Sequence, residues 1–192
     1  MLPSFQILPL TPQTNPTLLE QAANLLTIGF CEHWPDSWAD HESAMEEIHE
    51  MIAPGRICRA AMENETGEVL GWIGGIPEYD GNVWELHPLV VRPDIQGHGI
   101  GRALVIDFEA QVRVRGGLTI TLGSDDVDDM TTLANVNLYE NTWDHIQNIR
   151  NLKGHPYEFY QKLGYVITGV VPDANGPGKP DIMLSKRVQK ES

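Results

Sequence analysis

The feature that most restricts the fold of this chain is a glycine-rich segment between a predicted strand and a predicted helix. Residues 96–101 (QGHGIG) follow the apolar stretch 82–91 and precede a helical pattern through Leu104, Phe108 and Val112. The first N–H groups of a helix have no partner within the helix, and the helix dipole favours negative charge at that end. The segment therefore predicts an anion site, for example for a pyrophosphate, that is built from backbone groups.

The glycine spacing separates this segment from two common nucleotide-binding loops. It lacks the Gly-Lys-Ser/Thr sequence of a Walker loop, and neither its spacing nor the antiparallel pattern of the preceding strands fits a Rossmann fingerprint. Glycines also serve tight turns and close helix packing. Without its surroundings, the segment leaves phosphate binding open.

Hydrophobic periodicity divides the rest of the chain into short strands and helices. The expected strands are 5–8, 57–63, 69–76, 82–91, 118–122, 165–171 and 182–185. Helical patterns run through 18–30, 40–51, 104–112, 143–149 and 157–163. The loop 34–38 carries two tryptophans between the first two helices, and the acidic stretch 123–150 is otherwise hard to assign. With 192 residues and no repeat or linker, we expect one domain over residues 1–192.

The charge balance restricts the partners of the chain. There are 27 acidic and 13 basic residues, so the formal net charge is -14. This excess repels phosphate backbones, and we expect no nucleic-acid partner. It either serves solubility alone or attracts a cationic substrate.

Cysteine usage and hydropathy indicate a reduced, aqueous compartment. Cys31 and Cys58 are the two cysteines, and they form no CxxC motif or metal-type spacing, so neither a disulfide framework nor structural zinc is expected. The first residues lack the basic and apolar regions of a signal peptide, and no apolar run reaches about eighteen residues. We therefore expect a cytoplasmic protein without a membrane partner.

Several sequence blocks resemble one enzyme family. Gln96-x-x-Gly99-x-Gly101 after residues 90–93 is similar to the coenzyme A pyrophosphate loop of GNAT acetyltransferases. Further blocks resemble the aminoglycoside 6'-N-acetyltransferases of that superfamily: residues 34–37, 84–91, 122–126, 138–142, 155–160 and 172–176. The resemblance covers most of the chain.

The resemblance implies a fold and an activity. The fold would be α/β of the α+β type, with a mixed, mostly antiparallel central sheet flanked by helices. The activity would be direct transfer of acetyl from acetyl-CoA, as cosubstrate, to the 6'-amino group of an aminoglycoside. Family members are commonly homodimers, and the chemistry requires no metal, so none is expected.

Three residues are the candidates for catalysis. An amine attacks a thioester only as the free base, and Glu85, which strand alternation places on one face with His87 and Leu89, is the candidate proton acceptor. A backbone N–H where strand pairing is interrupted would stabilise the developing oxyanion, and the resemblance assigns this N–H to Leu89. The resemblance assigns proton return to the leaving thiolate to Tyr160, although Tyr157 lies one helical turn earlier. Glu85 is otherwise a solvated strand residue, and Tyr160 a core residue.

Two further sets of residues are candidates for binding. The resemblance implies that the coenzyme A site contains Leu89, Val91, Gln96, Gly97, His98, Gly99, Ile100, Gly101 and Arg102. Carboxylates suit a polycation, and aromatic rings suit sugar rings, so the substrate candidates are Trp34, Tyr79, Glu85, His87, Asp125, Asp126 and Glu140. The alternatives are that the acids form a solvated loop, that Trp34 and Trp38 anchor their loop to the core, and that His87 packs structurally.

Two other functions stay open at this point. One is a GNAT enzyme that acts on another polyamine or on a protein amine, because resemblance transfers fold better than substrate. A binding module that sequesters cationic drugs or senses coenzyme A without turnover is the alternative from another class.

Overall fold

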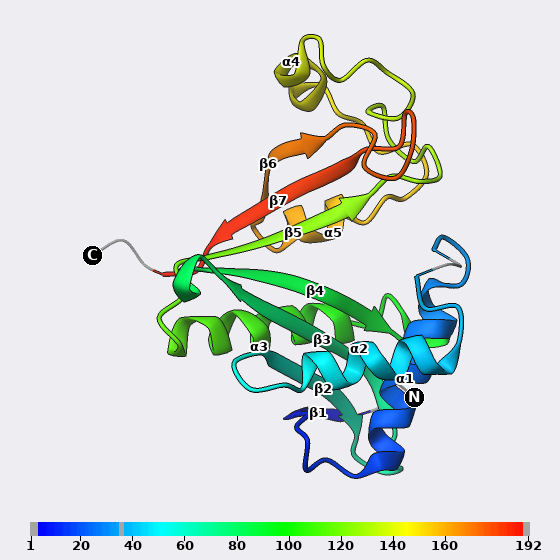
Figure 1. The fold of residues 1–192 in the computed structure, drawn as a ribbon, viewed down its shortest axis with the longest axis vertical. Coiled ribbons are helices and arrows are strands. Elements are labelled where there is room, and N and C mark those ends of the chain that lie inside the picture. Colours follow the sequence, from blue (N-terminus) through cyan, green and yellow to red (C-terminus); the bar gives the residue numbers. More distant parts are fainter. Residues whose placement is uncertain (1–3, 35–36, 190–192) are drawn as a thin grey trace. The chain divides into compact units, whose positions relative to one another are not determined.

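The computed structural model describes residues 4–34 and 37–189, which fall into two compact units (Figure 1). The first unit comprises the described residues as far as Leu118 together with Val188 and Gln189; the second is Thr119–Arg187. The single domain expected from the chain length stays a prediction. Of the predicted loop 34–38, Pro35 and Asp36 lie outside the described residues.

The first unit contains a four-stranded antiparallel sheet. Its strands follow one another in sequence order: β1 (Phe5–Pro9), β2 (Ile57–Glu63), β3 (Val69–Glu78) and β4 (Val83–Val91). The turn between β2 and β3 uses Gly67 at a φ of 73°, where a glycine is favoured over other residues. A short 3₁₀ helix, η1 (Tyr79–Gly81), connects β3 to β4. The predicted antiparallel meander is confirmed, and β3 runs two residues further than expected.

Three long helices accompany this sheet: α1 (Pro16–Phe30), α2 (His41–Met51) and α3 (Ile100–Val114). Asn15 caps α1 by accepting the N–H of Thr17 at 3.0 Å. Asp40 and Ser43 form a reciprocal capping box at the start of α2. The helical patterns expected in 18–30 and 40–51 are confirmed.

The two faces of the sheet are covered by different helices. A Cβ atom at Gly74 would meet Met51 of α2, whereas one at Gly75 would meet the ring of Phe108 of α3. Successive strand residues point to opposite faces, so α2 and α3 lie on opposite sides of β3. On the α1 and α2 side, buried hydrophobic residues form a continuous core around Trp72, whose Nε1 donates to the carbonyl of Ala22 at 2.9 Å.

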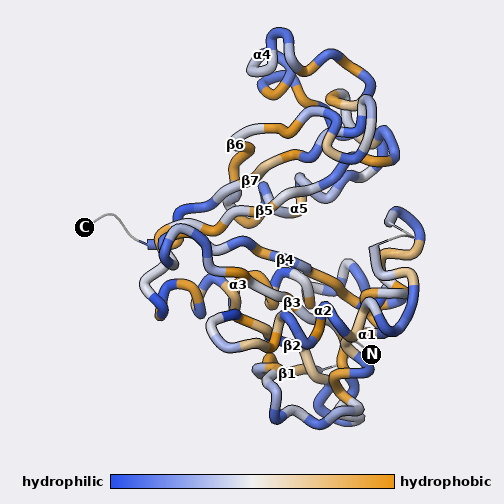
Figure 2. Tube along the Cα trace, viewed as in Figure 1, coloured by the Kyte–Doolittle hydropathy of each residue, from blue (hydrophilic) through white to orange (hydrophobic). Residues whose placement is uncertain are grey.

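The second unit has a three-stranded antiparallel sheet. Its strands lie in the order β5 (Thr119–Asp125), β7 (Asp181–Arg187) and β6 (Val166–Val171). The short helices α4 (Thr142–Gln147) and α5 (Tyr157–Lys162) complete it. Figure 2 shows hydrophobic colour along its strands, and hydrophobic and hydrophilic residues alternating between β5 and α4. Strand β5 runs past the expected end at residue 122, because Gly123, Ser124 and Asp125 remain paired with β7.

These elements confirm the predicted fold class, a mixture of helices with mostly antiparallel strands. Among the helices that the structure describes, none combines the length and the apolar character that crossing a membrane requires.

Candidate active site

Strand β4 presents the predicted catalytic face. Along Val83–Val91, buried and partly exposed residues alternate, and Glu85, His87 and Leu89 share the partly exposed face. The side chains of Trp84 and Val90 point the other way and are buried. The predicted placement of the three candidate residues on one face agrees with this pattern.

The strand pairing is interrupted next to Leu89. Ile73 of β3 pairs with Leu89, but Gly75 pairs with Leu86, so His87 and Pro88 together face the single residue Gly74. This two-against-one arrangement is a β-bulge, and the His87–Pro88 peptide bond within it is cis. The resemblance implies an interruption near this position, and the bulge provides one. The oxyanion role of the Leu89 N–H stays a prediction.

Aromatic rings join the early loop to this face. The ring of Phe30 at the end of α1 packs edge-on against Trp34 at 5.8 Å and against Trp38 at 4.7 Å between centroids. Trp38 also lies 6.0 Å from the imidazole of His87. Trp38 therefore packs on the core and contacts the candidate face at the same time.

Tyr79 lies apart from these rings. It occupies η1 in the turn before β4, with a φ of 48°, and is 76 % exposed. Within residues 4–34 and 37–189 it makes no ring contact. Its proposed contact with sugar rings remains a prediction.

One residue of this region was missed by the sequence reasoning. Glu47 of α2 reaches β4, and its Oε1 lies 3.8 Å from Nε2 of His87. The signal was present, because Glu47 falls on the same side of the helix as the buried Ala44, Ile48 and Met51. Its partner is forty residues away in the chain, and periodicity does not reveal such a contact.

The glycine-rich segment forms the predicted loop before α3. It follows η2 (Pro93–Ile95), and Gln96 donates from Nε2 to the carbonyl of Val91 at 3.2 Å. Gly97 and Gly99 have φ values of 77° and 89°, and a Cβ atom at either would have no atom within 4 Å. The glycines are thus required by the backbone conformation rather than by packing.

The start of α3 leaves donors available to a ligand. Ala103 donates to Gly99, which is the first bond of the helix. The N–H groups of Gly97–Arg102 donate to no residue in the part of the chain that the structure describes. Residues 96–99 and Arg102 are exposed, and Ile100 is buried. The segment therefore fits an anionic group such as a pyrophosphate.

Asp126 in the second unit differs from the expected substrate contact. It is 0 % exposed, and its carboxylate accepts three hydrogen bonds: from the N–H of Met130 at 2.6 Å, and from the N–H and Oγ1 of Thr131 at 2.9 and 2.7 Å. These bonds close the loop that follows β5. The binding role of Asp126 stays a prediction, and its burial argues against that role.

Other acids of this stretch also bind the chain itself. Asp125 accepts a hydrogen bond from the side chain of Asn175, and Asp129 pairs with Lys179 at 2.6 Å. The hydrogen bond from Lys179 lowers the pKa of Asp129. Glu140 differs, because its side chain is exposed and forms no hydrogen bond or ion pair with the described residues. The Glu140 carboxylate is therefore open to a cation.

Helix α5 contains both tyrosine candidates, and their surroundings differ. Tyr157 is 3 % exposed and packs its ring against His155 at 5.6 Å. Tyr160 is half-buried between the rings of Phe159 and Tyr165. Burial raises the pKa of both hydroxyls, so the pKa does not distinguish the two tyrosines. The partial exposure of Tyr160 favours it over the buried Tyr157, and its catalytic role stays a prediction.

His155 fixes the start of α5. Its Nδ1 accepts the N–H of Tyr157 at 3.1 Å, so its Nε2 carries the proton and donates to the carbonyl of Asp125 at 3.0 Å. The ring is 1 % exposed, and burial lowers its pKa. The sequence showed this residue only as part of a resembling block.

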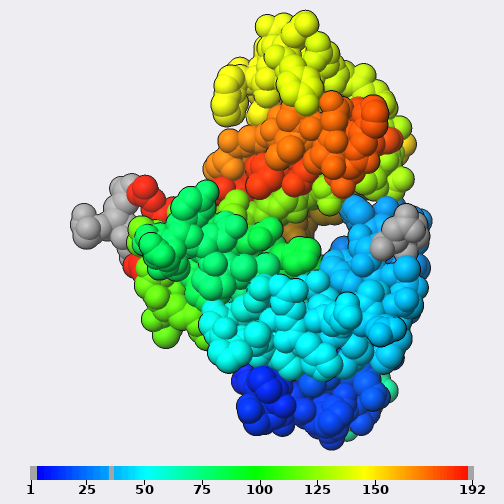
Figure 3. Space-filling view, viewed as in Figure 1, coloured from blue at the N-terminus to red at the C-terminus, as the bar shows by residue number. Residues whose placement is uncertain are grey.

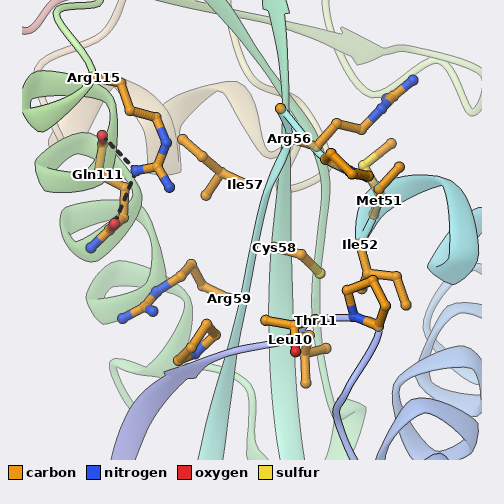
Figure 4. A pocket seen from close by; sticks show the side chains of 15 residues that line it. Leu10, Thr11, Met51, Ile52, Arg56, Ile57, Cys58, Arg59, Gln111 and Arg115 are labelled. Atoms are coloured by element: carbon orange, nitrogen blue, oxygen red, sulfur yellow. Dashed lines mark hydrogen bonds between the residues drawn. The ribbon is translucent and has the colours of Figure 1, made fainter.

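The pocket in Figure 4 lies elsewhere in the first unit. Among its lining residues, Gln111 comes from α3, Arg115 caps the end of that helix, and Arg59 comes from β2. Arg59 is bound to Asp107 at 2.6 Å, and Arg115 to Gln111 at 3.0 Å. None of the predicted site residues is among the described residues that line it. Within the described residues, no group of three or more His, Cys, Asp or Glu side chains could hold a metal ion.

Comparison with known proteins places this geometry in a family. Residues 19–142 match the model of the acetyltransferase (GNAT) family. Two crystal structures are 44 % identical, with a TM-score of 0.88, covering 97 % of this chain and 99 % of theirs: an aminoglycoside 6'-N-acetyltransferase complexed with coenzyme A, and the aminoglycoside 6'-N-acetyltransferase from Enterococcus faecium. An aminoglycoside 6'-acetyltransferase type Ii is 38 % identical over the same shares, with a TM-score of 0.73. No match was found among curated proteins. The resemblance inferred from sequence is thereby confirmed, and the chain belongs to the acetyltransferase (GNAT) family.

Proposed function

We propose that this protein transfers an acetyl group from acetyl-CoA to the 6'-amino group of an aminoglycoside. The observation that carries the proposal is the 44 % identity, over nearly the whole chain, to enzymes named for this reaction, one of them holding coenzyme A. The partly exposed β4 face with Glu85 and the open donors before α3 supply groups that such a reaction uses. The family match runs through residues of both units, which supports a single functional domain.

The proposed steps are those of direct attack. Acetyl-CoA supplies the acetyl group as a thioester. Glu85 accepts a proton from the substrate ammonium, directly or through water, and the free amine forms the new C–N bond. The Leu89 N–H donates to the oxygen that becomes negatively charged, the C–S bond breaks, and Tyr160 gives its proton to the thiolate sulfur. The second proton of the nitrogen passes to solvent as the amide forms, and Tyr160 is reprotonated from solvent.

Binding is assigned to separate sets of groups. The backbone of Gln96–Gly101, with Leu89, Val91 and Arg102, would hold coenzyme A, because these donors suit its pyrophosphate. Trp34, His87 and Glu140 are the substrate contacts that the surroundings support best, since they are at least partly exposed. Asp125 and Tyr79 are weaker proposals, because Asp125 is already bound to Asn175 and Tyr79 has no packed ring beside it among the described residues.

Three further proposals accompany this function. The cytoplasm is the proposed location, because the substrate acetyl-CoA is made and used there and the two cysteines are unpaired. Resistance to aminoglycosides is the proposed consequence of the activity. A homodimer is proposed from the family resemblance alone.

A thiol-release assay tests the proposal. Acetyl-CoA is supplied with two aminoglycosides, one bearing a 6'-amine and the other a 6'-hydroxyl, and product masses are measured. We expect turnover of the amine alone. Turnover of neither would contradict the proposal and favour another polyamine, a protein amine or a binding module without turnover.

A further inference from the structure

Glu47 is an acidic residue on the buried side of α2. Its side chain is 16 % exposed, and Oε1 is buried without a hydrogen-bond partner among the described residues. Figure 3 shows α2 in cyan on the surface of the first unit, with the solvent-facing side of the helix outward. A buried carboxylate oxygen without a donor costs free energy, so its presence requires an explanation.

A row of residues across three strands surrounds this carboxylate. Cys58 of β2 pairs with Gly74 of β3, and Gly74 faces His87 in the bulge of β4. Because Gly74 has no side chain, Met51 of α2 can approach the sheet closely there. Glu47 lies one helical turn before Met51, and so its side chain reaches the same row.

The negative charge of Glu47 affects the Cys58 thiol of this row. Burial, and after it the negative charge of Glu47, raise the pKa of the Cys58 thiol to about 12. A protonated thiol is a weak donor, so Cys58 does not replace a strong hydrogen bond to the carboxylate. Glu85, the other acid near His87, is on β4 itself, two residues away.

The imidazole of His87 is a strong donor next to this carboxylate. The 3.8 Å between its Nε2 and Oε1 of Glu47 exceeds a hydrogen bond by about 1 Å, a gap that a small side-chain rotation closes. The His87 side chain is 43 % exposed and that of Glu47 16 %, so Glu47 lies on the buried side of the imidazole. Trp38 packs beside the ring, and Nδ1 forms no hydrogen bond with the described residues.

We infer that Glu47 is a positioning residue that acts through His87. Its buried oxygen accepts the Nε2–H of His87, and this tautomer leaves the lone pair of Nδ1 to accept an N–H or O–H of the acceptor substrate. The inference rests on the proposed function, because it assigns His87 to the substrate amine or a neighbouring hydroxyl. It also gives the unpaired oxygen of Glu47 a donor.

Three variants on α2 test the inference by kinetics. Glu47→Met removes the acceptor and keeps the helix; we expect kcat/KM for the aminoglycoside to fall about tenfold, with KM for acetyl-CoA unchanged. Glu47→Gln keeps an acceptor oxygen, and we expect at least half of this loss, on a logarithmic scale, to be restored. Glu46→Met is the matched control on the exposed side of the same helix and should leave kcat/KM unchanged. Equal losses in the Met and Gln variants would overturn the inference.

A double-mutant cycle separates positioning from general packing. In a His87→Ala background, Glu47→Met should cause no further loss, because its effect passes through the imidazole. If the loss of kcat/KM in the double variant equals the product of the two single losses, the inference is overturned.

Nitrogen NMR of His87 gives a readout that needs no turnover. We expect the Nε2-protonated tautomer in the wild-type protein and in Glu47→Gln, and a mixture of tautomers in Glu47→Met. A wild-type protein with the Nδ1-protonated tautomer would overturn the inference. An inactive wild-type protein with the expected tautomer would instead overturn the proposed function alone.

Discussion

The two units of this molecule use polar side chains in opposite ways. In the first unit, Glu85 and His87 lie on the partly exposed face of a strand and the glycine loop keeps its N–H groups open. In the second unit, Asp126, Asp129 and His155 are bound by their own chain. The difference teaches that the number of acids in a segment is a poor guide to its capacity for binding a cation, because many of them close loops.

The largest expected effect is a loss of catalysis through Glu85 of the first unit. Glu85→Gln removes the proton acceptor while keeping the shape of the side chain, and we expect kcat for aminoglycoside acetylation to fall about 100-fold or more. KM for acetyl-CoA should stay the same. Steady-state kinetics across a range of pH measures both, with Glu65→Gln, in the exposed β2–β3 turn, as the control. An unchanged rate at every pH would remove Glu85 from the mechanism.

The next effect concerns the stability of the second unit. Asp126→Ala leaves the N–H groups of Met130 and Thr131 without their acceptor, and we expect the free energy of unfolding to fall by about 2–3 kcal/mol. Urea denaturation measures this change. The KM for the aminoglycoside should change little under conditions where the variant is folded. A large rise in KM with unchanged stability would show instead that Asp126 binds substrate and that the contrast between the units is wrong.

For Glu140 of the same unit we expect a change in substrate binding and none in stability. Its exposed carboxylate has no partner among the described residues, so Glu140→Gln should leave the urea midpoint unchanged. We expect KM for the aminoglycoside to rise about threefold to tenfold, since an exposed ion pair is worth on the order of 1 kcal/mol. Asp144→Asn in α4, a nearby exposed acid, is the matched control. An unchanged KM in the Glu140 variant would contradict a role of this carboxylate in binding the substrate.

The contrast between the units also explains what the sequence could predict. The alternation of β4 and the glycine loop depend on neighbouring residues, so the face of Glu85 and the open N–H groups could be predicted. The burial of Asp126 could not be predicted, because the sequence of an acidic run is the same whether its carboxylates face solvent or the N–H groups of their own loop. Glu47 was missed because its partner His87 comes from a distant strand.

The smallest expected effect is a pH dependence of the second unit through His155. Burial lowers the pKa of this imidazole below its ordinary value of 6.5, although the nearby Asp125 and Asp126 act in the opposite direction. Below pH 6.5 the unfolded chain therefore binds more protons at this site than the folded protein does. The stabilisation by neutral His155 is thus complete above pH 6.5 and is lost as the pH falls toward the folded pKa. Protonation at Nδ1 would also remove the acceptor for the N–H of Tyr157.

His155→Asn isolates this contribution, because the amide does not titrate and its oxygen can still accept the N–H two residues later. Loss of the bond to Asp125 should lower the free energy of unfolding by about 1 kcal/mol at pH 7.5. Between pH 7.5 and 5.5 the wild-type protein should lose more stability in urea than the variant does, whereas His49→Gln, at an exposed histidine of α2, should behave as the wild type. Parallel losses in the wild type and the His155 variant would mean that the imidazole binds protons equally in the folded and unfolded states, and that the start of α5 is fixed by packing around Tyr157 rather than by a titratable hydrogen bond.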